Sequence, residues 1–388
     1  MTMELRRPRK YPIDFRSKET EFVMNCWKAV NSCSLVGVGS VGKSNLLQHL
    51  ADTDVHRHYL GQSNDANVLA IIIDPSMIGP LPESGPNRDA ERCWAGYELM
   101  MHRLIMAVIS RNLLKADDIS ELYGFYTALQ DGSNPLYAYM GLRYFEFGLN
   151  LIIDRLKTRI VFMFDEFEDM LKLLPVKFFL TLRGLRDANR TYITYLTFTR
   201  SPLLRLVDRF GISPQEIEPF TELFTDNVWY VGPYNDRDAR RMASNLMSRT
   251  EKNYPPEALE FLVWATGGYA GLLRSTFHLM DELGQLDSTN RLNNEMVAEL
   301  VKKQAIEEEC MRMWDSLLPS EHDVLRSLAG LQRIERDTVF DRSVTLLAYK
   351  KLLRPDRERN TLTIQPPIFR QFITTNGPML QQAGNNNR

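Results

Sequence analysis

A glycine-rich segment, Gly37-Val-Gly-Ser-Val-Gly-Lys-Ser44, joins a short apolar run to a helical pattern. Its spacing is that of a phosphate-binding P-loop, in which glycines let backbone N–H groups approach phosphate oxygens. The lysine places a cation beside the β- and γ-phosphates, and the serine hydroxyl is a ligand for Mg²⁺. The motif therefore predicts ATP or ADP with Mg²⁺, bound by Gly37, Val38, Gly39, Ser40, Val41, Gly42, Lys43, Ser44 and Asn45.

Two carboxylates follow a second apolar segment, 160–164. Asp165 stands directly after this predicted strand and is expected to hold Mg²⁺ together with Ser44. Glu166 comes next and is expected to polarise the water that attacks the γ-phosphate, with Lys43 as the catalytic cation. These residues predict an ATP hydrolase. Taken alone, the segment could also be a strand that ends in a solvated acidic turn.

A third apolar segment, 192–198, leads into Thr199 and Arg200. If its strand lies beside the carboxylate strand, both residues stand at the edge of the sheet where a γ-phosphate would be. We expect Thr199 to contact the nucleotide and the catalytic cation Arg200 to distinguish ATP from ADP. The alternative is that a Thr-Arg pair after a strand is an ordinary loop.

The elements that must position these residues alternate between short β-branched runs and longer helical patterns. This alternation predicts an α/β fold with a parallel sheet and crossover helices. The segment 67–74 is continuously apolar, as in a strand that is covered on both faces. The predicted strands are 34–37, 67–74, 159–165, 192–198 and 227–231, and the two longest helical patterns among them are 89–112 and 136–157.

The strand signals stop after Gly232-Pro233, and three helical patterns follow at 236–249, 256–265 and 270–283. They predict a small helical lid domain. A charged helix (294–314), two shorter helices (321–329 and 339–353) and a hairpin (352–364) then predict a winged helix. The expected organisation is an N-terminal segment (1–30), a P-loop ATPase domain (31–232), a lid (233–292), a winged helix (293–375) and a disordered tail (376–388).

In this order the motifs resemble those of STAND-type ATPases of the AAA+ group, which are related to NB-ARC and origin-initiator ATPases. The resemblance covers about residues 11–373, and Thr199-Arg200 is similar to the NB-ARC element whose arginine senses the γ-phosphate. The segment 265–274 resembles the lid motif, although Ala270 stands where relatives have proline, and 12–19 resembles the segment that packs on adenine. The resemblance implies nucleotide contacts from Phe15, Arg16, Tyr269 and Arg274, the last as a second sensor arginine.

Composition limits the partners and the location. Apolar residues make up 44% and charged residues 25% of the chain, which excludes a fibrous or wholly disordered protein. The 47 basic and 49 acidic residues give a net charge of −2, which argues against a surface that is basic throughout. The four cysteines are scattered, and the apolar runs are too short to span a bilayer. We therefore expect a soluble cytoplasmic protein without a membrane partner.

Three functions fit these residues. The first is an ATP-driven conformational switch that hydrolyses ATP slowly and acts through self-assembly or a separate effector protein. The second is a DNA-associated ATPase, initiator-like or a transposition regulator, whose winged helix binds duplex DNA. The third is a nucleotide-binding scaffold that never hydrolyses ATP, against which Asp165 and Glu166 argue. The basic cluster that supports the second function is Lys350, Lys351, Arg354, Arg357 and Arg359.

Overall fold

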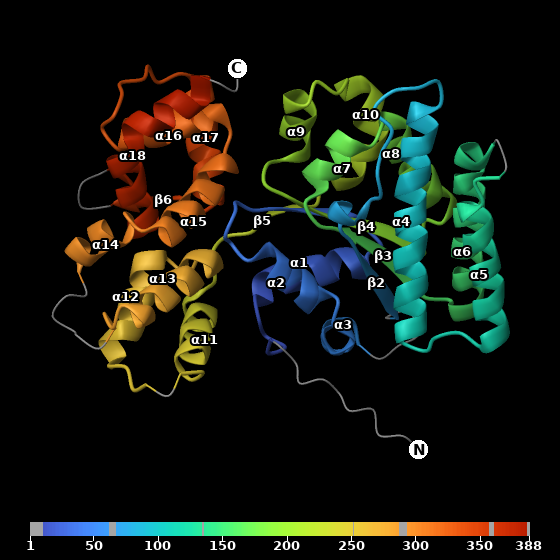
Figure 1. Ribbon diagram of the computed structural model, residues 1–388, viewed down its shortest axis with the longest axis horizontal. Coiled ribbons are helices and arrows are strands. Elements are labelled where there is room, and N and C mark those ends of the chain that lie inside the picture. Colours follow the sequence, from blue (N-terminus) through green and yellow to red (C-terminus); the bar gives the residue numbers. More distant parts are fainter. Residues whose placement is uncertain are drawn as a thin grey trace. The chain divides into compact units, whose positions relative to one another are not determined.

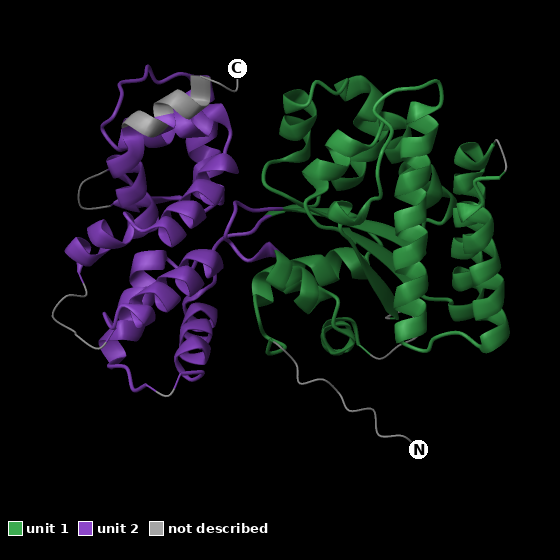
Figure 2. Cartoon of the chain, in the orientation of Figure 1, with its two compact units in different colours: residues 1–35, 44–229 green, residues 36–43, 230–388 purple. Residues whose placement is uncertain are grey.

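The computed structural model describes residues 11–61, 67–133, 136–250, 252–286, 293–356 and 361–385. The chain divides into two compact units, residues 1–35 with 44–229 and residues 36–43 with 230–388 (Figure 2). The P-loop segment 36–43 therefore groups with the C-terminal part of the chain, although both of its flanks belong to the first unit. The five-part division that the sequence predicts stays a prediction.

A five-stranded sheet has the order β2-β3-β4-β1-β5 (Figure 1). β2, β3 and β4 pair in parallel, with Ile73 beside Phe164 and Phe164 beside Thr197. The carboxyl ends of β2, β3 and β4 therefore meet at one edge, which brings together the polar residues that follow them. The strands are β1 (Cys33–Val36), β2 (Val68–Ile73), β3 (Arg159–Phe164), β4 (Ile193–Thr199) and β5 (Val228–Tyr230).

Helices of the first unit pack around a core of buried aromatic rings, among them Phe162, Phe178 and Tyr195. Full burial of one such side chain contributes about 1.5–3 kcal/mol of transfer free energy. The helices are α1 (Ser17–Lys28), α2 (Lys43–Leu50), α3 (Thr53–Leu60), α4 (Arg88–Ser110), α5 (Ala116–Gln130), α6 (Tyr137–Leu156), α7 (Phe167–Leu173), α8 (Val176–Ala188), α9 (Leu203–Arg209) and α10 (Pro214–Thr221), with short turns η2 (Pro75–Met77) and η3 (Glu222–Phe224).

The second unit is mostly helical, and its helix ends follow local sequence signals. Asn235 caps the first helix by accepting from the Asp238 N–H at 2.8 Å, and Gly267 ends the second with a φ of 57°. In the described part of the chain, no helix is both long enough and apolar enough to cross a membrane. The elements are α11 (Asp236–Met247), α12 (Pro256–Thr266), α13 (Ala270–Glu282), α14 (Asn294–Leu300), α15 (Gln304–Asp315), α16 (Pro319–Leu328), α17 (Thr338–Tyr349), β6 (Leu353–Asp356), β7 (Thr361–Ile364) and α18 (Pro367–Asn385).

Two C-terminal segments differ from the sequence prediction. The expected single helix 294–314 is two helices, because Lys303 has extended backbone at φ −92° and ψ 132° between α14 and α15. The last helix, α18, continues beyond residue 376, where disorder was expected. Its extension packs on the rest of the unit: Leu380 is buried, and a Cβ on Gly377 would lie 2.5 Å from Leu331. Such apolar contacts offset the entropy lost by ordering the chain.

Lys350 does not belong to the basic surface that the sequence predicts. Its Nζ lies 2.7 Å from Oε2 of Glu321, and both side chains are fully buried. Burial lowers the pKa of Lys350, and the neighbouring carboxylate opposes this shift. Of the remaining cluster, Lys351 and Arg354 are exposed, whereas Arg357 and Arg359 lie outside the described residues.

Candidate nucleotide site

The P-loop leaves β1 with a backbone that depends on small residues. Gly42 has a φ of +89°, and a Cβ there would lie 3.1 Å from both Ala270 and Tyr234. Ser40 has a φ of 63°, which is uncommon for a residue other than glycine. Strained backbone of this kind persists where the surrounding structure holds it, and it concentrates at binding sites. Val38 and Val41 are fully buried, so these two residues can offer a ligand only their backbone.

Lys43 is held against the backbone of the same loop. Its Nζ donates to the carbonyl of Gly37 at 2.6 Å and to that of Val38 at 3.3 Å, and only 8% of the residue is exposed. Phosphate oxygens carry full negative charge and are stronger acceptors than neutral carbonyls. The loop therefore keeps a desolvated cation in the segment where the sequence predicts phosphate binding.

Two helices of the second unit contact the P-loop directly. The Gly271 N–H of α13 donates to the Ser40 carbonyl at 2.9 Å. The Ser40 hydroxyl donates to the carboxylate of Glu309 in α15. The Gly39 N–H donates to Oγ of Ser316, directly after α15, at 3.1 Å. Loop conformation is therefore coupled by hydrogen bonds to both the lid and the C-terminal helices.

Sequence reasoning missed Glu309 and Ser316. The bond between Ser40 and Glu309 joins positions 269 residues apart, and neither residue lies in a recognisable motif. In the structure, burial is what marks Glu309 as a candidate functional residue, because this carboxylate is only 4% exposed. The close approach also explains the second glycine of the motif: a Cβ on Gly39 would lie 2.4 Å from the carbonyl of Arg312.

The metal-binding residues predicted in the first unit lie together. Oγ of Ser44 is 3.5 Å from Oδ2 of Asp165, and Oδ1 of Asp165 accepts the Glu166 N–H at 3.0 Å. At the end of the neighbouring strand, Oγ1 of Thr199 is buried and has no hydrogen-bond partner in the part of the chain that the structure describes. Hydroxyl and carboxylate oxygens are the ligands that Mg²⁺ prefers, so this set of donors fits the metal.

The predicted catalytic carboxylate is paired with the predicted sensor arginine. Nη2 of Arg200 lies 2.9 Å from Oε1 of Glu166, and its Nε lies 3.2 Å from Oε1 of Glu168. Burial works against the charge of Arg200, but these carboxylates outweigh it and raise its pKa. Glu166 has a φ of 40° at the start of α7, which is uncommon for a residue other than glycine. Both carboxylates therefore hold the guanidinium of Arg200 at the end of β4.

The two residues expected near adenine in the first unit are buried. Phe15 stacks on Tyr11, with ring centroids 4.5 Å apart, and meets the His49 ring edge-on at 5.3 Å. Arg16 is 1% exposed, and its Nη1 lies 2.9 Å from Oε1 of Glu19. Phe15 thus lies against α2, which follows the P-loop. The guanidinium of Arg16 is held by its ion pair with Glu19. Their contacts with a nucleotide stay a prediction.

The two lid residues differ in exposure. Tyr269 is buried, which raises the pKa of its hydroxyl, and that hydroxyl donates to the Lys350 carbonyl at 3.2 Å. Arg274 is exposed on α13, three residues after Gly271, whose N–H binds the P-loop. Tyr269 therefore links the lid to the C-terminal helices, and Arg274 keeps an accessible guanidinium on the helix that contacts the P-loop.

No protein-family model and no curated protein sequence matches this chain. The ORC2 protein of Aeropyrum pernix, solved as ADPNP–ADP complexes, is similar with a TM-score of 0.51 and 11% identity over 95% of this chain and 94% of that chain. The Walker-type ATPase of Pyrococcus abyssi is similar with a TM-score of 0.49 and 14% identity over 95% of this chain and 98% of that chain. Cdc6p from Pyrobaculum aerophilum is similar with a TM-score of 0.44 and 10% identity over 98% of this chain and 97% of that chain.

Of these three similarities, the first is strong enough to define a shared fold. The chain has an α/β fold in which a parallel-sheet P-loop domain is followed by a helical lid and a C-terminal domain, as the sequence predicts.

Proposed function

We propose that this chain is an ATP-dependent molecular switch. It binds ATP with Mg²⁺ at the P-loop, hydrolyses the γ-phosphate slowly and transmits the nucleotide state to its C-terminal helices. The observation that carries this proposal is the contact of the P-loop with α15, made by Ser40 with Glu309 and by Gly39 with Ser316. A ligand can shift such a switch only through contacts that differ between two states. The bonds of Ser40 and Gly39 could differ in this way, because they lie on the loop that would receive the phosphates.

The residues divide the chemistry among them. Lys43 and the backbone N–H groups of the P-loop neutralise and orient the phosphates. Ser44 and Asp165 hold Mg²⁺, which supplies further positive charge at the phosphate oxygens. Glu166 orients and polarises the attacking water once it has released Arg200, and Arg200 then becomes available to the γ-phosphate.

Electrostatics gives Glu309 a direct part in the switch. Its buried carboxylate binds the Ser40 hydroxyl, and Arg312 partly compensates its charge at 3.4 Å. Phosphates entering the P-loop add negative charge beside this carboxylate, and like charges in a poorly solvated site repel strongly. Nucleotide binding is therefore expected to weaken the Ser40–Glu309 bond and to loosen α15.

Glu309→Gln tests the proposal, because the amide keeps an acceptor for Ser40 but removes the repelled charge. In the unaltered chain, ATP and ADP should give different patterns of limited proteolysis around α15. In the variant this difference should be reduced at least severalfold, while nucleotide affinity is retained or increased. The matched control is Glu308→Gln, since Glu308 is exposed on the same helix. An undiminished difference in Glu309→Gln, or an equal loss in the control, would contradict the coupling.

Arg200→Ala is expected to weaken ATP binding more than ADP binding. ADP has no γ-phosphate for the guanidinium to contact, whereas a charge-assisted hydrogen bond is worth roughly 1.5–3 kcal/mol, about ten- to a hundredfold in relative affinity. Titration calorimetry with ADP and a non-hydrolysable ATP analogue measures the ratio. The control is Arg205→Ala, an exposed arginine on α9. Equal losses for both nucleotides would leave Arg200 only the role of holding Glu166 and Glu168.

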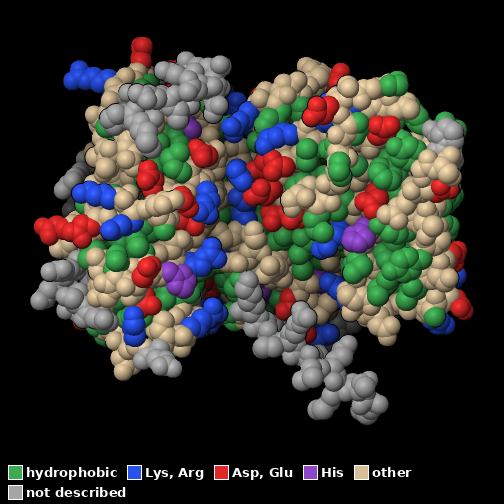
Figure 3. Space-filling model, in the orientation of Figure 1, with side chains coloured by type: hydrophobic (Ala, Val, Ile, Leu, Met, Phe, Trp, Pro, Cys, Tyr) green, Lys and Arg blue, Asp and Glu red, His purple; other side chains and the backbone are tan. Residues whose placement is uncertain are grey.

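A DNA-associated ATPase is the second candidate. The exposed Lys351 and Arg354 beside the β6–β7 hairpin favour it, as does the fold shared with the ORC2 protein. Burial of Lys350 weakens it, and Figure 3 shows side chains of both charges interspersed over the face drawn. Binding to arbitrary duplex DNA that falls with rising salt, and that Lys351→Ala with Arg354→Ala reduces, would favour this candidate.

A further inference from the structure

The outer edge of the sheet offers a second site, separate from the nucleotide residues. β2 is the terminal strand in the sheet order, so in the described part of the chain one of its edges has no strand beside it. The carbonyls of Asn67 and Ile73 accept hydrogen bonds from the β3 side. Because backbone groups alternate between the two edges of a strand, those of Val68, Ala70 and Ile72 face away from β3. Two of these residues already have side-chain partners, since Arg103 donates to the Ile72 carbonyl and His56 bonds to the backbone of Val68, so an added strand would have to displace these side chains. An open edge of this kind is a template for another extended chain.

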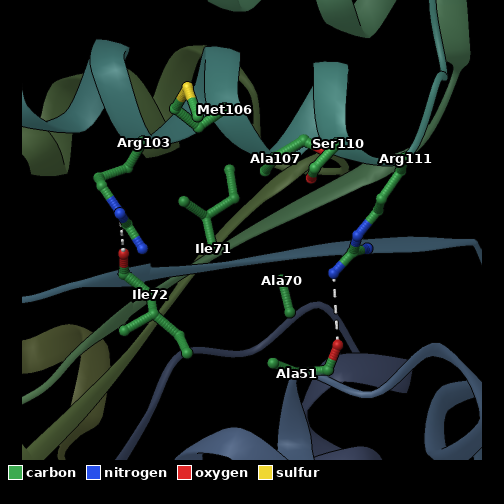
Figure 4. A pocket seen from close by; sticks show the side chains of 9 residues that line it. All are labelled: Ala51, Ala70, Ile71, Ile72, Arg103, Met106, Ala107, Ser110 and Arg111. Atoms are coloured by element: carbon green, nitrogen blue, oxygen red, sulfur yellow. Dashed lines mark hydrogen bonds between the residues drawn. The ribbon is translucent and has the colours of Figure 1, made fainter. Parts of the chain in front are cut away.

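A groove follows this edge. Its first part has a volume of about 310 Å³ and lies among residues 70–72 of β2, the C-terminal half of α4 and Ala51 (Figure 4). Its second part, of about 730 Å³, continues along Val68 and Leu69 and shares Ser110 and Arg111 with the first. The two parts together run along most of β2, which is the length that an added strand would occupy.

Two arginines of the groove lack an acidic partner at ion-pair distance. Figure 4 shows Arg103 and Arg111 extending from α4 at opposite ends of the first part. Arg103 Nε donates to the Ile72 carbonyl at 3.1 Å, and Arg111 Nη2 donates to the Ala51 carbonyl at 3.3 Å. Within the described ranges neither arginine forms an ion pair, and no Asp or Glu lines either part. Burial lowers the pKa of Arg111, although Asp52 opposes the shift, so this poorly solvated charge would gain from an anion.

The spacing of the arginines indicates the ligand. Arg103 lies in α4 and Arg111 directly after its last residue, and their separation of eight residues corresponds to about 12 Å along a helix. Residues i and i+4 of an extended chain face the same side and lie about 13 Å apart. We propose that the open edge of β2 binds an extended peptide segment of a partner protein, with acidic side chains at i and i+4 paired to Arg103 and Arg111. A peptide fits better than a nucleic acid, because the floor is partly apolar (Ile71, Met106) and the edge presents backbone groups at a strand repeat.

The test uses two labelled peptides of identical composition and the full chain. Ser-Glu-Val-Thr-Val-Glu-Ser has its acids at i and i+4, and Ser-Glu-Val-Thr-Glu-Val-Ser has them at i and i+3, on opposite faces. Fluorescence anisotropy at low salt should show at least about tenfold tighter binding of the first. Arg103→Gln with Arg111→Gln should reduce that binding about tenfold or more. Glutamine at 103 can still donate to the Ile72 carbonyl, because its Nε2 is as many bonds from Cα as the arginine Nε that makes this bond. Arg88→Gln, at the far end of α4, should change nothing.

Four results would overturn the proposal. Equal binding of the two peptides, or binding that survives the double substitution in a chain whose thermal unfolding is unchanged, would exclude the arginine pair. Undiminished binding of a peptide N-methylated on the nitrogens that face β2 would exclude strand addition. Arginine-dependent binding of a single-stranded oligonucleotide without binding of either peptide would assign the groove to nucleic acid. Lys43→Ala should leave peptide binding unchanged, so failure of the nucleotide proposal can be told apart from failure of this one.

Discussion

Lys43→Ala is expected to reduce ATP and ADP affinity by at least about a hundredfold. The substitution removes the P-loop cation, and charge-assisted hydrogen bonds to phosphate contribute roughly 1.5–3 kcal/mol each. It also removes the donor that bonds to the carbonyls of Gly37 and Val38, so the loop loses part of its own support. Equilibrium binding of a fluorescent nucleotide measures the effect.

Two controls keep this result interpretable. Lys18→Ala removes an exposed lysine of α1 and should leave affinity unchanged. Thermal unfolding of Lys43→Ala without nucleotide shows whether the chain remains folded. We expect it to remain folded, because the ammonium supports only part of the loop. A folded Lys43→Ala chain that binds ATP with unaltered affinity would mean that the glycine-rich turn is not a phosphate-binding loop.

The glycine-rich turn stands out in the sequence as a candidate phosphate-binding loop because its chemistry is local. Turn, cation and hydroxyl fall within eight consecutive residues, and each residue type has a physical reason to stand at its position. The same holds for Asp165 and Glu166, since a buried strand ending in carboxylates is visible without any knowledge of the partner strands. The contact of Ser44 with Asp165 depends in addition on the sheet order, in which β4 lies between β1 and β3.

The contacts that tie the P-loop to α15 could not be predicted. Glu309 stands in a charged stretch whose residues are read as solvated, and only tertiary packing buries it. Lys350 shows the same limit, because a lysine near other basic residues predicts a surface cluster, whereas its buried partner Glu321 is 29 residues away. Pairing between distant charged residues leaves no periodic signal in a single sequence.

The backbone conformation of the predicted catalytic carboxylate could not be predicted from the sequence either. The left-handed φ of Glu166 breaks the run of β3 and starts α7, although nothing in its residue type demands that conformation. Arg16 and Ser40 share this left-handed backbone, so three predicted site residues carry conformations that favour glycine. Strain of this kind is offset by the surrounding fold and concentrates at functional positions.

Glu166→Gln is expected to keep ATP affinity within a few-fold while lowering single-turnover hydrolysis by about a hundred- to ten-thousandfold. The amide cannot polarise the attacking water as a carboxylate does, and a positioned general base contributes rate factors of that size. Asp165 and Ser44 are unaltered, so Mg²⁺ and the phosphates should still bind. Quenched-flow hydrolysis with parallel nucleotide binding separates the two quantities.

The matched control is Asp169→Asn, which neutralises another carboxylate of α7 that is ion-paired to Lys172 at 2.6 Å. It should hydrolyse ATP at the rate of the unaltered chain. Unchanged hydrolysis in Glu166→Gln would remove this residue from the mechanism, whereas lost binding would assign it to Mg²⁺ instead. Because the introduced amide can still accept a hydrogen bond from Arg200 but no longer forms an ion pair with it, the variant should also release the arginine more readily. We therefore expect it to accumulate the ATP-bound state, in which limited proteolysis around α15 reports the switch without turnover.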